Sequence, residues 1–267
     1  MVSPRQFAAV LLLAFAVTGG LLTALFSQFV SARPADAELA AMLAAPGGAR
    51  GLHRVEYMPP MPGDAPEPLR NTVETGFQWV QLDASHLGNG LRCSHCHFRG
   101  GLTEGGKNGG ISLVGAAARD PLHLSDKINN CLRVDLNATT AETPDKLAAA
   151  NAYLVWISKG IPLYATAPWL GIAPLQAGRP PEPAAGQKTF AEVCAQCHGP
   201  DGQGTPIAPA VWGPRSFTTA ASMARLELLA SFVHLNMPRQ NPTLTPGQAV
   251  DAAAYVLAQS RPAPQRP

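Results

Sequence analysis

The sequence has few charged residues and no run of one sign. Lysine, arginine, aspartate and glutamate make up only 14% of the 267 residues, and the formal net charge is +2. A nucleic-acid-binding domain needs a basic face to neutralise phosphates, so this composition predicts no nucleic-acid partner. Proline and glycine are abundant by contrast, with 26 and 25 residues, which indicates a chain rich in loops.

Cysteine is also scarce, and four of the five cysteines lie in two copies of one motif, C-x-x-C-H. The two copies consist of Cys93, Cys96 and His97, and of Cys194, Cys197 and His198. Two thiols at this spacing can each bond to one porphyrin, and the histidine that follows can bind its iron. A zinc site needs further ligands nearby, and a redox pair has no use for the histidine. The sequence therefore predicts two covalently bound c-type hemes, with zinc knuckles or disulfides as the alternative.

The two motifs divide the chain into two similar halves. Each half has the order helix, C-x-x-C-H, loops, distal ligand and closing helix, which indicates a weak internal duplication. The expected fold is mainly α, with two cytochrome c-like heme domains in tandem after an N-terminal transmembrane or signal helix. The expected heme domains cover residues 71–163 and 184–262, with a proline-rich linker at 164–183 and a proline-rich tether at 33–70.

Residues 7–28 form an almost unbroken apolar run. The run is longer than the core of a typical signal peptide and is about long enough to span a bilayer. We therefore expect residues 1–32 to be an uncleaved membrane anchor, although the small residues at 30–32 keep a cleaved signal peptide as the alternative. Arg5 before the run and Asp36 after it agree with a location on the periplasmic side of the inner membrane, or in the periplasm if cleaved.

Apolar spacing and capping signals predict the helices around the motifs. The expected helices cover residues 71–82, 125–132, 144–158, 186–193 and 223–234, with a closing helix that begins at Pro246. Thr143 and Thr245 are the expected N-caps, each followed by proline in the first helical turn. Gly186 and Phe190 lie where the two terminal helices of the second domain should cross closely.

The distal ligand of the second heme is expected to be Met237. It follows His198 by 39 positions and precedes the last helix, so that a loop can bring its thioether across the porphyrin. Met223 and His234 are the alternatives, and Met223 is interpreted as a core residue because it begins an apolar helix.

The first heme has no methionine available, because none lies between His97 and Met223. Cys131 and His123 are left as distal ligands. An isolated cysteine is often only a buried core residue. A lone thiol in an exported chain nevertheless needs a reason, and thiolate ligation would supply one while lowering the potential of that heme.

The chain resembles the diheme thiosulfate dehydrogenase family, which is related to the SoxA-type cytochromes of sulfur oxidation. The resemblance covers about residues 71–262 and rests on LRCSHCH at 91–97, INNC at 128–131, CAQCHGPDGQG at 194–204, WGPRSF at 212–217, NMP at 236–238, DAAAY at 251–255 and SRP at 260–262. It implies that His97 and Cys131 bind the first iron, and that His198 and Met237 bind the second.

The resemblance also implies that Cys131 is a reaction site for thiosulfate, with Lys127 and Arg133 as candidate side chains that hold the anion. The chain departs from the family pattern on both sides of this cysteine. Lys127 replaces an arginine, and the segment 134–138 replaces Arg-Ser-Met-Asn-Gly and puts Asp135 where the family has serine. A carboxylate beside a bound dianion would cost on the order of several kcal/mol.

Two functions are therefore compatible with the sequence. The first is a membrane-tethered electron-transfer cytochrome that serves a redox partner protein, namely a cytochrome, a dehydrogenase or a terminal oxidase. The alternative is a thiosulfate dehydrogenase or tetrathionate reductase that reacts at Cys131, and sulfur chemistry on another substrate is a third. Asp135 and the expected anchor favour the carrier, whereas Cys131 favours the enzyme.

Overall fold

The computed structural model describes most of the chain after residue 57. It describes residues 58–82, 90–103, 105–138, 142–167, 169–176 and 178–264. Within these ranges the regular structure is helical, and the β-contacts are two isolated bridges, Ser112–Gly171 and Thr205–Ala208. The mainly helical fold predicted from the sequence is confirmed.

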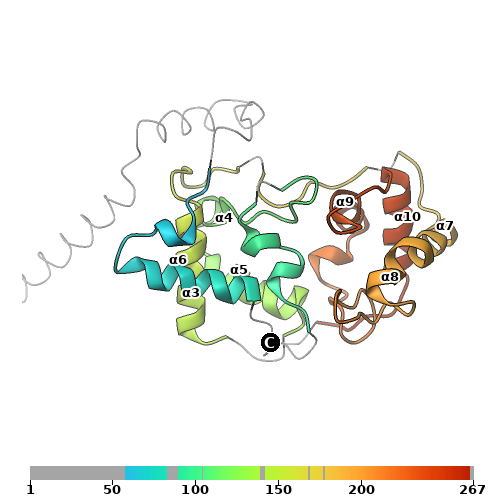
Figure 1. Cartoon of the computed structure of the whole chain (residues 1–267), viewed down its shortest axis with the longest axis horizontal. Helices are drawn as coiled ribbons and strands as arrows, with labels where there is room; N and C mark the ends of the chain where they lie inside the picture. The colour runs from blue at the N-terminus through green and yellow to red at the C-terminus, as the bar shows by residue number, and fades with distance from the viewer. Residues whose placement is uncertain are drawn as a thin grey trace, which may run out of the picture.

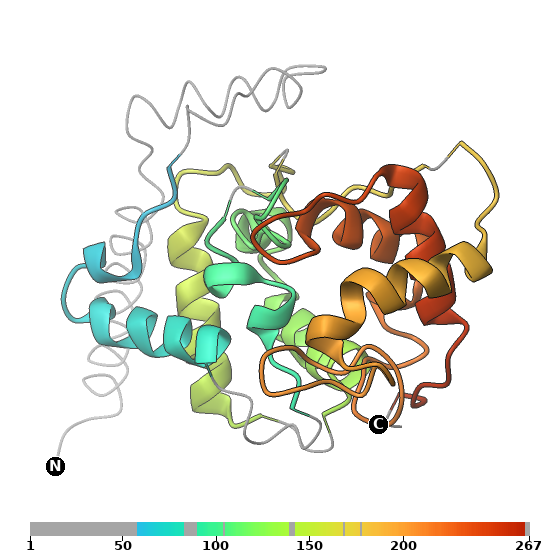
Figure 2. The ribbon, with the colours of Figure 1, turned by 45° about the vertical axis from the view of Figure 1, so that its right-hand side comes forward.

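The helices fall into two groups along the chain (Figure 1). The α-helices are α3 (Leu69–Leu82), α4 (Ala116–Arg119), α5 (Leu124–Asn130), α6 (Pro144–Ile157), α7 (Pro183–Thr189), α8 (Ala195–His198), α9 (Leu226–Asn236) and α10 (Pro246–Leu257). The 3-10 helices are η2 (Pro62–Asp64), η3 (Cys93–His95), η4 (Phe98–Gly101) and η7 (Ser222–Ala224), and the π-helical turns are η5 (Cys131–Asp135) and η6 (Phe190–Cys194). Figure 2 shows α3 and α6 crossing in one group while α7, α9 and α10 pack together in the other.

The first group is built on the crossing of α3 and α6. Gly76 lies buried at this crossing, where a Cβ atom would overlap the backbone carbonyl of Ala149. Beside it the rings of Phe77 and Tyr153 lie 5.5 Å apart, and the Tyr153 hydroxyl donates to the carbonyl of Gly100 at 2.9 Å. The helix crossing therefore also fixes the loop that follows the first motif.

The second group uses the same device. Gly186 of α7 is buried against α10, where a Cβ atom would overlap the carbonyl of Asp251. Phe190 packs against Trp212 and Tyr255, with ring centroids 4.6 Å and 5.8 Å away. The predicted close crossing at Gly186 and Phe190 is confirmed, and its cause is the missing side chain of glycine.

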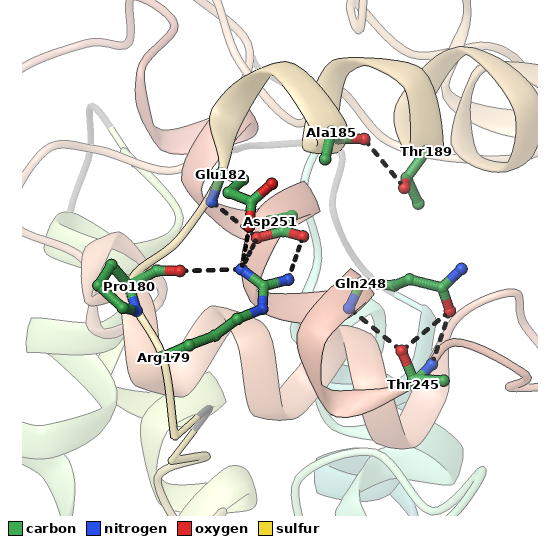
Figure 3. Close-up of polar contacts among 8 residues, drawn as sticks. All are labelled: Arg179, Pro180, Glu182, Ala185, Thr189, Thr245, Gln248 and Asp251. Carbon is green, nitrogen blue, oxygen red and sulfur yellow. Dashed lines mark hydrogen bonds and ion pairs between the residues drawn. The ribbon is translucent and has the colours of Figure 1, made fainter.

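Two of the predicted helix starts are confirmed by their caps. Thr143 accepts from the Lys146 amide at 3.4 Å, and Thr245 and Gln248 form the predicted capping box (Figure 3). The helix expected at 125–132 instead changes into a π-helical turn at Cys131, and the helix expected at 223–234 begins at Leu226 after a separate 3-10 turn. Both differences arise where the backbone leaves the regular 3.6-residue repeat that apolar spacing detects.

The N-terminal predictions fall mainly on residues that the structure does not describe. The apolar run at 7–28 lies outside the described ranges. Of the helices in the described ranges, none has the length and apolar character needed to cross a bilayer. The end of the proline-rich tether is described, and Trp156 of α6 donates to the carbonyl of Met61 at 2.8 Å. This part of the tether therefore lies over the first helix group.

An ion pair attaches the proline-rich linker to the last helix. Arg179 donates to both carboxylate oxygens of Asp251, at 3.0 Å and 2.6 Å, and the Glu182 amide donates to the same carboxylate at 2.8 Å (Figure 3). The Asp251 side chain is only 5% exposed, whereas that of Arg179 is 39% exposed. The hydrogen bonds from Arg179 and Glu182 lower the pKa of Asp251, although burial opposes them.

We predict that Gly76→Ala destabilises the protein by about 1–3 kcal/mol, because the added methyl group must push α3 away from α6. Thermal unfolding followed by circular dichroism measures the effect. Gly63→Ala is the matched control, because a Cβ there would make only ordinary contact with Glu74 at 3.6 Å. Equal melting temperatures for the two variants would contradict the close crossing.

We predict that Asp251→Asn lowers stability by about 1–2 kcal/mol, after allowance for the solvent exposure of Arg179. The pKa of Asp251 is lower in the folded protein than in the unfolded chain. The stability that its carboxylate contributes is therefore complete above the unfolded-state pKa, and it is lost as the pH falls through the folded-state pKa. The difference in melting temperature from the wild type should thus be constant near neutral pH and shrink below about pH 4. Glu182→Gln, which alters an exposed partner of the same arginine, should change stability little at any pH.

Candidate heme centres

The first C-x-x-C-H motif presents its histidine in one fixed orientation. The Nδ1 atom of His97 lies 2.9 Å from the carbonyl oxygen of Ile111. A proton on Nδ1 satisfies this carbonyl and leaves Nε2 available as a metal ligand. Burial lowers the pKa of His97, which favours the neutral imidazole that binds metals.

The second motif repeats this arrangement on α8. The Nδ1 atom of His198 lies 2.7 Å from the carbonyl oxygen of Pro209, and burial lowers the pKa of this histidine too. Thr205 donates to the carbonyl of Cys197 at 2.6 Å and so fixes the loop that follows. Each motif thus offers two thiols and an imidazole with one nitrogen held by a carbonyl, a donor set that fits a c-type heme.

Cys131 lies close to the first motif. It is half-buried and begins the π-helical turn η5, a type of turn that often occurs at functional sites. Burial is the main cause that raises the pKa of this thiol well above its ordinary value, and the nearby Asp135, Cys93 and Cys96 raise it further. The structure therefore brings Cys131, 34 positions after His97, to the same place as the attachment cysteines.

His123, the other residue considered for the first iron, is placed differently. Its side chain is 64% exposed, and Nδ1 lies 3.0 Å from Asp120 on the protein surface. The geometry thus favours Cys131 over His123 as the distal ligand.

Met237 lies where α9 ends. Its backbone is extended, with φ −124° and ψ 139°, and its side chain packs at the edge of the second core. Met223 is 8% exposed inside that core, and the Nδ1 atom of His234 lies 2.8 Å from the carbonyl of Leu244. Met223 lies within the 3-10 helix η7 and His234 lies within α9. Of the three residues considered for the second iron, Met237 is the one that lies outside a helix.

Asp135 has a role that the sequence did not predict. Its carboxylate accepts a hydrogen bond from the Ser222 amide at 2.7 Å, and the neighbouring carbonyl of Val134 accepts one from Thr218 at 2.6 Å. Burial raises the pKa of Asp135, while the bonds to Ser222 lower it. The turn after Cys131 therefore joins the two helix groups. No local signal could have shown this, because the partners lie more than eighty positions apart.

Lys127 and Arg133, the predicted anion-holding residues, make other contacts. Lys127 lies 2.8 Å from Asp120 and is 54% exposed, and Arg133 donates to the Asn130 side chain at 3.2 Å. Hydrogen bonds from Lys127 and His123 lower the pKa of Asp120 to about 2. Within the described part of the chain, no cation contributes to the pKa shift of Cys131.

A group of cationic side chains between the two motifs was not predicted from the sequence. Burial lowers the pKa of His95 to about 4, and Arg92, His198 and Arg239 lower it further because all three lie nearby. The Arg239 guanidinium lies 3.5 Å above the Phe98 ring, which itself packs in the second core. The loop after the first motif therefore reaches into the second helix group.

Comparison with known proteins agrees with this arrangement. Residues 181–256 match the family model "Cytochrome C oxidase, cbb3-type, subunit III". The thiosulfate dehydrogenase of Allochromatium vinosum is 34% identical over 199 residues, which cover 68% of this chain and 73% of that protein. The thiosulfate dehydrogenase of Stutzerimonas stutzeri is 30% identical over 237 residues, which cover 80% and 75%. The chain belongs to the thiosulfate dehydrogenase family.

A solved structure extends the comparison to the fold. The thiosulfate dehydrogenase TsdBA of Marichromatium purpuratum, in its "as isolated" form, superposes with a TM-score of 0.67 at 30% identity. The match covers 76% of this chain and 49% of that one, so the chain spans about half the length of that relative. The predicted family is confirmed, and membership of the thiosulfate dehydrogenase family implies covalent c-type heme. The number of hemes and the iron ligands stay predictions.

We predict that Cys131→Gly removes the thiolate character of the low-spin ferric heme signals, because it removes the sulfur ligand of the first iron. Electron paramagnetic resonance and optical spectra of the purified holoprotein measure this change. His123→Ala is the control and should leave both spectra unchanged. If the spectra change in His123→Ala and not in Cys131→Gly, the assignment of Cys131 is wrong.

Proposed function

We propose that this chain is a diheme c-type cytochrome that transfers electrons to a redox partner protein outside the cytoplasm. The observation that carries the proposal is the repeated arrangement of His97 and His198, each oriented by a loop carbonyl within a C-x-x-C-H motif. Cys93 and Cys96 would attach the first heme, and Cys194 and Cys197 the second. The bound hemes would supply reversible one-electron chemistry.

The distal residues give the two centres different chemistry. The thiolate of Cys131 favours ferric iron, whereas the thioether of Met237 favours ferrous iron. The first centre would then have the lower potential. This order favours electron flow from the first helix group to the second, and from there to the partner protein.

The charges around Cys131 support a carrier more than an anion-binding enzyme. Among the neighbouring groups whose charge raises the pKa of Cys131, the Asp135 carboxylate has the largest effect, and Lys127 forms an ion pair with Asp120. A dianion such as thiosulfate would therefore meet repulsion on one side and no attraction from Lys127 on the other.

Thiosulfate oxidation or tetrathionate reduction at Cys131 is the second candidate. Cys131 is half-buried and lies beside the first motif, and the relatives reported above are thiosulfate dehydrogenases. The Ser222 amide also offsets part of the charge of Asp135. In the oxidative direction two thiosulfate ions would join as one tetrathionate and release two electrons to the protein.

We also propose that residues 1–32 hold the protein on the periplasmic side of the inner membrane, or direct it to the periplasm if they are cleaved. The apolar run at 7–28 supports this location, as does the covalent attachment of c-type heme outside the cytoplasm.

We predict that thiosulfate does not reduce the oxidised holoprotein, because Asp135 repels the dianion, while dithionite, a strong reductant that needs no binding site beside Cys131, reduces it fully. Heme absorbance under anaerobic conditions measures reduction. Asp135→Asn removes the charge but keeps an acceptor for Ser222. A repulsion of about 1.4 kcal/mol corresponds to a tenfold change in binding, so thiosulfate-dependent reduction should rise by at least about tenfold in this variant.

The opposite outcome would favour the second candidate. Rapid reduction of the wild type with stoichiometric tetrathionate, and its loss in Cys131→Gly, would replace the carrier proposal with thiosulfate oxidation. Failure of dithionite to reduce the wild type or Cys131→Gly would contradict electron transfer itself.

A further inference from the structure

A short segment at residues 108–111 connects the first motif to the end of α9. At one end of the segment, the Ile111 amide donates to the carbonyl of Cys96 at 2.9 Å, and the Ile111 carbonyl is the partner of the His97 ring. The segment therefore helps to orient the histidine of the first motif.

The other end of the segment contacts the residues on both sides of Met237. The Asn108 amide donates to the carbonyl of Leu235 at 2.8 Å, and the Asn108 side chain donates to the carbonyl of Gln240 at 3.3 Å. The Gly110 amide donates to the side-chain oxygen of Asn236 at 2.8 Å. Two of these hydrogen bonds hold backbone carbonyls before and after Met237, and the third holds the side chain of Asn236, all against one segment of the first half.

Among the residues joined by these hydrogen bonds, Asn236 is the one whose polar side chain is hardest to explain by packing. It is the last residue of α9, precedes Met237 directly and is fully buried, with 0% exposure. Its side-chain nitrogen is buried and has no hydrogen-bond partner in the described structure. Leaving a buried amide without a hydrogen-bond partner is destabilising, so an apolar residue of similar shape would pack at lower cost. What an apolar residue could not provide is the acceptor for Gly110.

Gly110 packs closely against the loop of the first motif. Its φ is +67°, and a Cβ atom would lie 2.7 Å from the Phe98 ring and 2.8 Å from the carbonyl of Cys96. The Gly110 amide is thus fixed by the loop of the first motif, and the side chain of Asn236 is held by a rigid partner.

We propose that Asn236 is a positioning residue for Met237. Its bond to Gly110 fixes the point where the backbone leaves α9, and it ties that point to the loop that orients His97. A methionine side chain has three rotatable bonds, so its sulfur stays on an iron only if its backbone is held in place. This inference rests on the proposed assignment of His198 and Met237 to the second heme.

The test compares variants of Asn236 in the purified holoprotein. Asn236→Leu keeps the approximate shape and removes the acceptor. We expect it to lose the red charge-transfer band of methionine-ligated ferric heme and to lower the potential of the second heme, with far-ultraviolet circular dichroism unchanged. Asn236→Asp keeps an acceptor oxygen and should retain the band. If Asn236→Leu does not accumulate, Asn236→Ser gives the same test, because its hydroxyl is too short to reach Gly110.

Two controls separate the possible failures. Ser231→Ala removes another buried polar group from α9 and should leave the band and the potential unchanged. A band that is lost in Met237→Ala but kept in Asn236→Leu would overturn the positioning role alone. A band that survives Met237→Ala would overturn the assignment of Met237, and the positioning role with it.

Discussion

Each candidate heme centre depends on a hydrogen bond between a histidine ring and a loop carbonyl. His97 has Ile111 as its partner and His198 has Pro209, so in both motifs Nδ1 is occupied and Nε2 is available. A loop carbonyl can hold a ring in place only if the loop itself is fixed. In the first half this is achieved by the crossing of α3 and α6, because Tyr153 reaches from α6 to the carbonyl of Gly100. The close approach of backbones at Gly76 thus supports the orientation of His97, 21 positions later.

The two helix groups are joined mainly by polar contacts that lie beside the proposed iron ligands. Val134 and Asp135, which follow Cys131 closely, accept hydrogen bonds from Thr218 and Ser222. Residues 108–110 form hydrogen bonds with the residues around Met237. Phe98 adds an apolar contact, since it comes from the first motif and packs on Phe232 at 5.8 Å. The rate of electron transfer between two centres depends on the distance between them. Contacts that lie next to the proposed iron ligands would keep that distance constant.

The charges around Cys131 explain why membership of the family does not by itself determine whether the protein reacts with thiosulfate. The chain belongs to the thiosulfate dehydrogenase family, with 30–34% identity to two of its members over 68–80% of the chain. The charges next to the Cys131 sulfur belong to this chain, because the Asp135 carboxylate lies nearby and Lys127 forms an ion pair with Asp120. A reaction with a dianion depends on these few charges, whereas electron transfer depends on the ligands and the spacing of the centres.

The sequence by itself determined the local features of this protein. The two C-x-x-C-H motifs and the caps at Thr143 and Thr245 depend on residues a few positions apart, so their spacing was sufficient evidence. Only the tertiary structure decided which carbonyl orients each histidine, that Cys131 rather than His123 lies beside the first motif, and that Asp135 and Asn236 join the two halves. The physical reason is distance along the chain: Asn236 and Gly110 are 126 positions apart, and no local propensity or periodicity records a hydrogen bond between residues that only folding brings together.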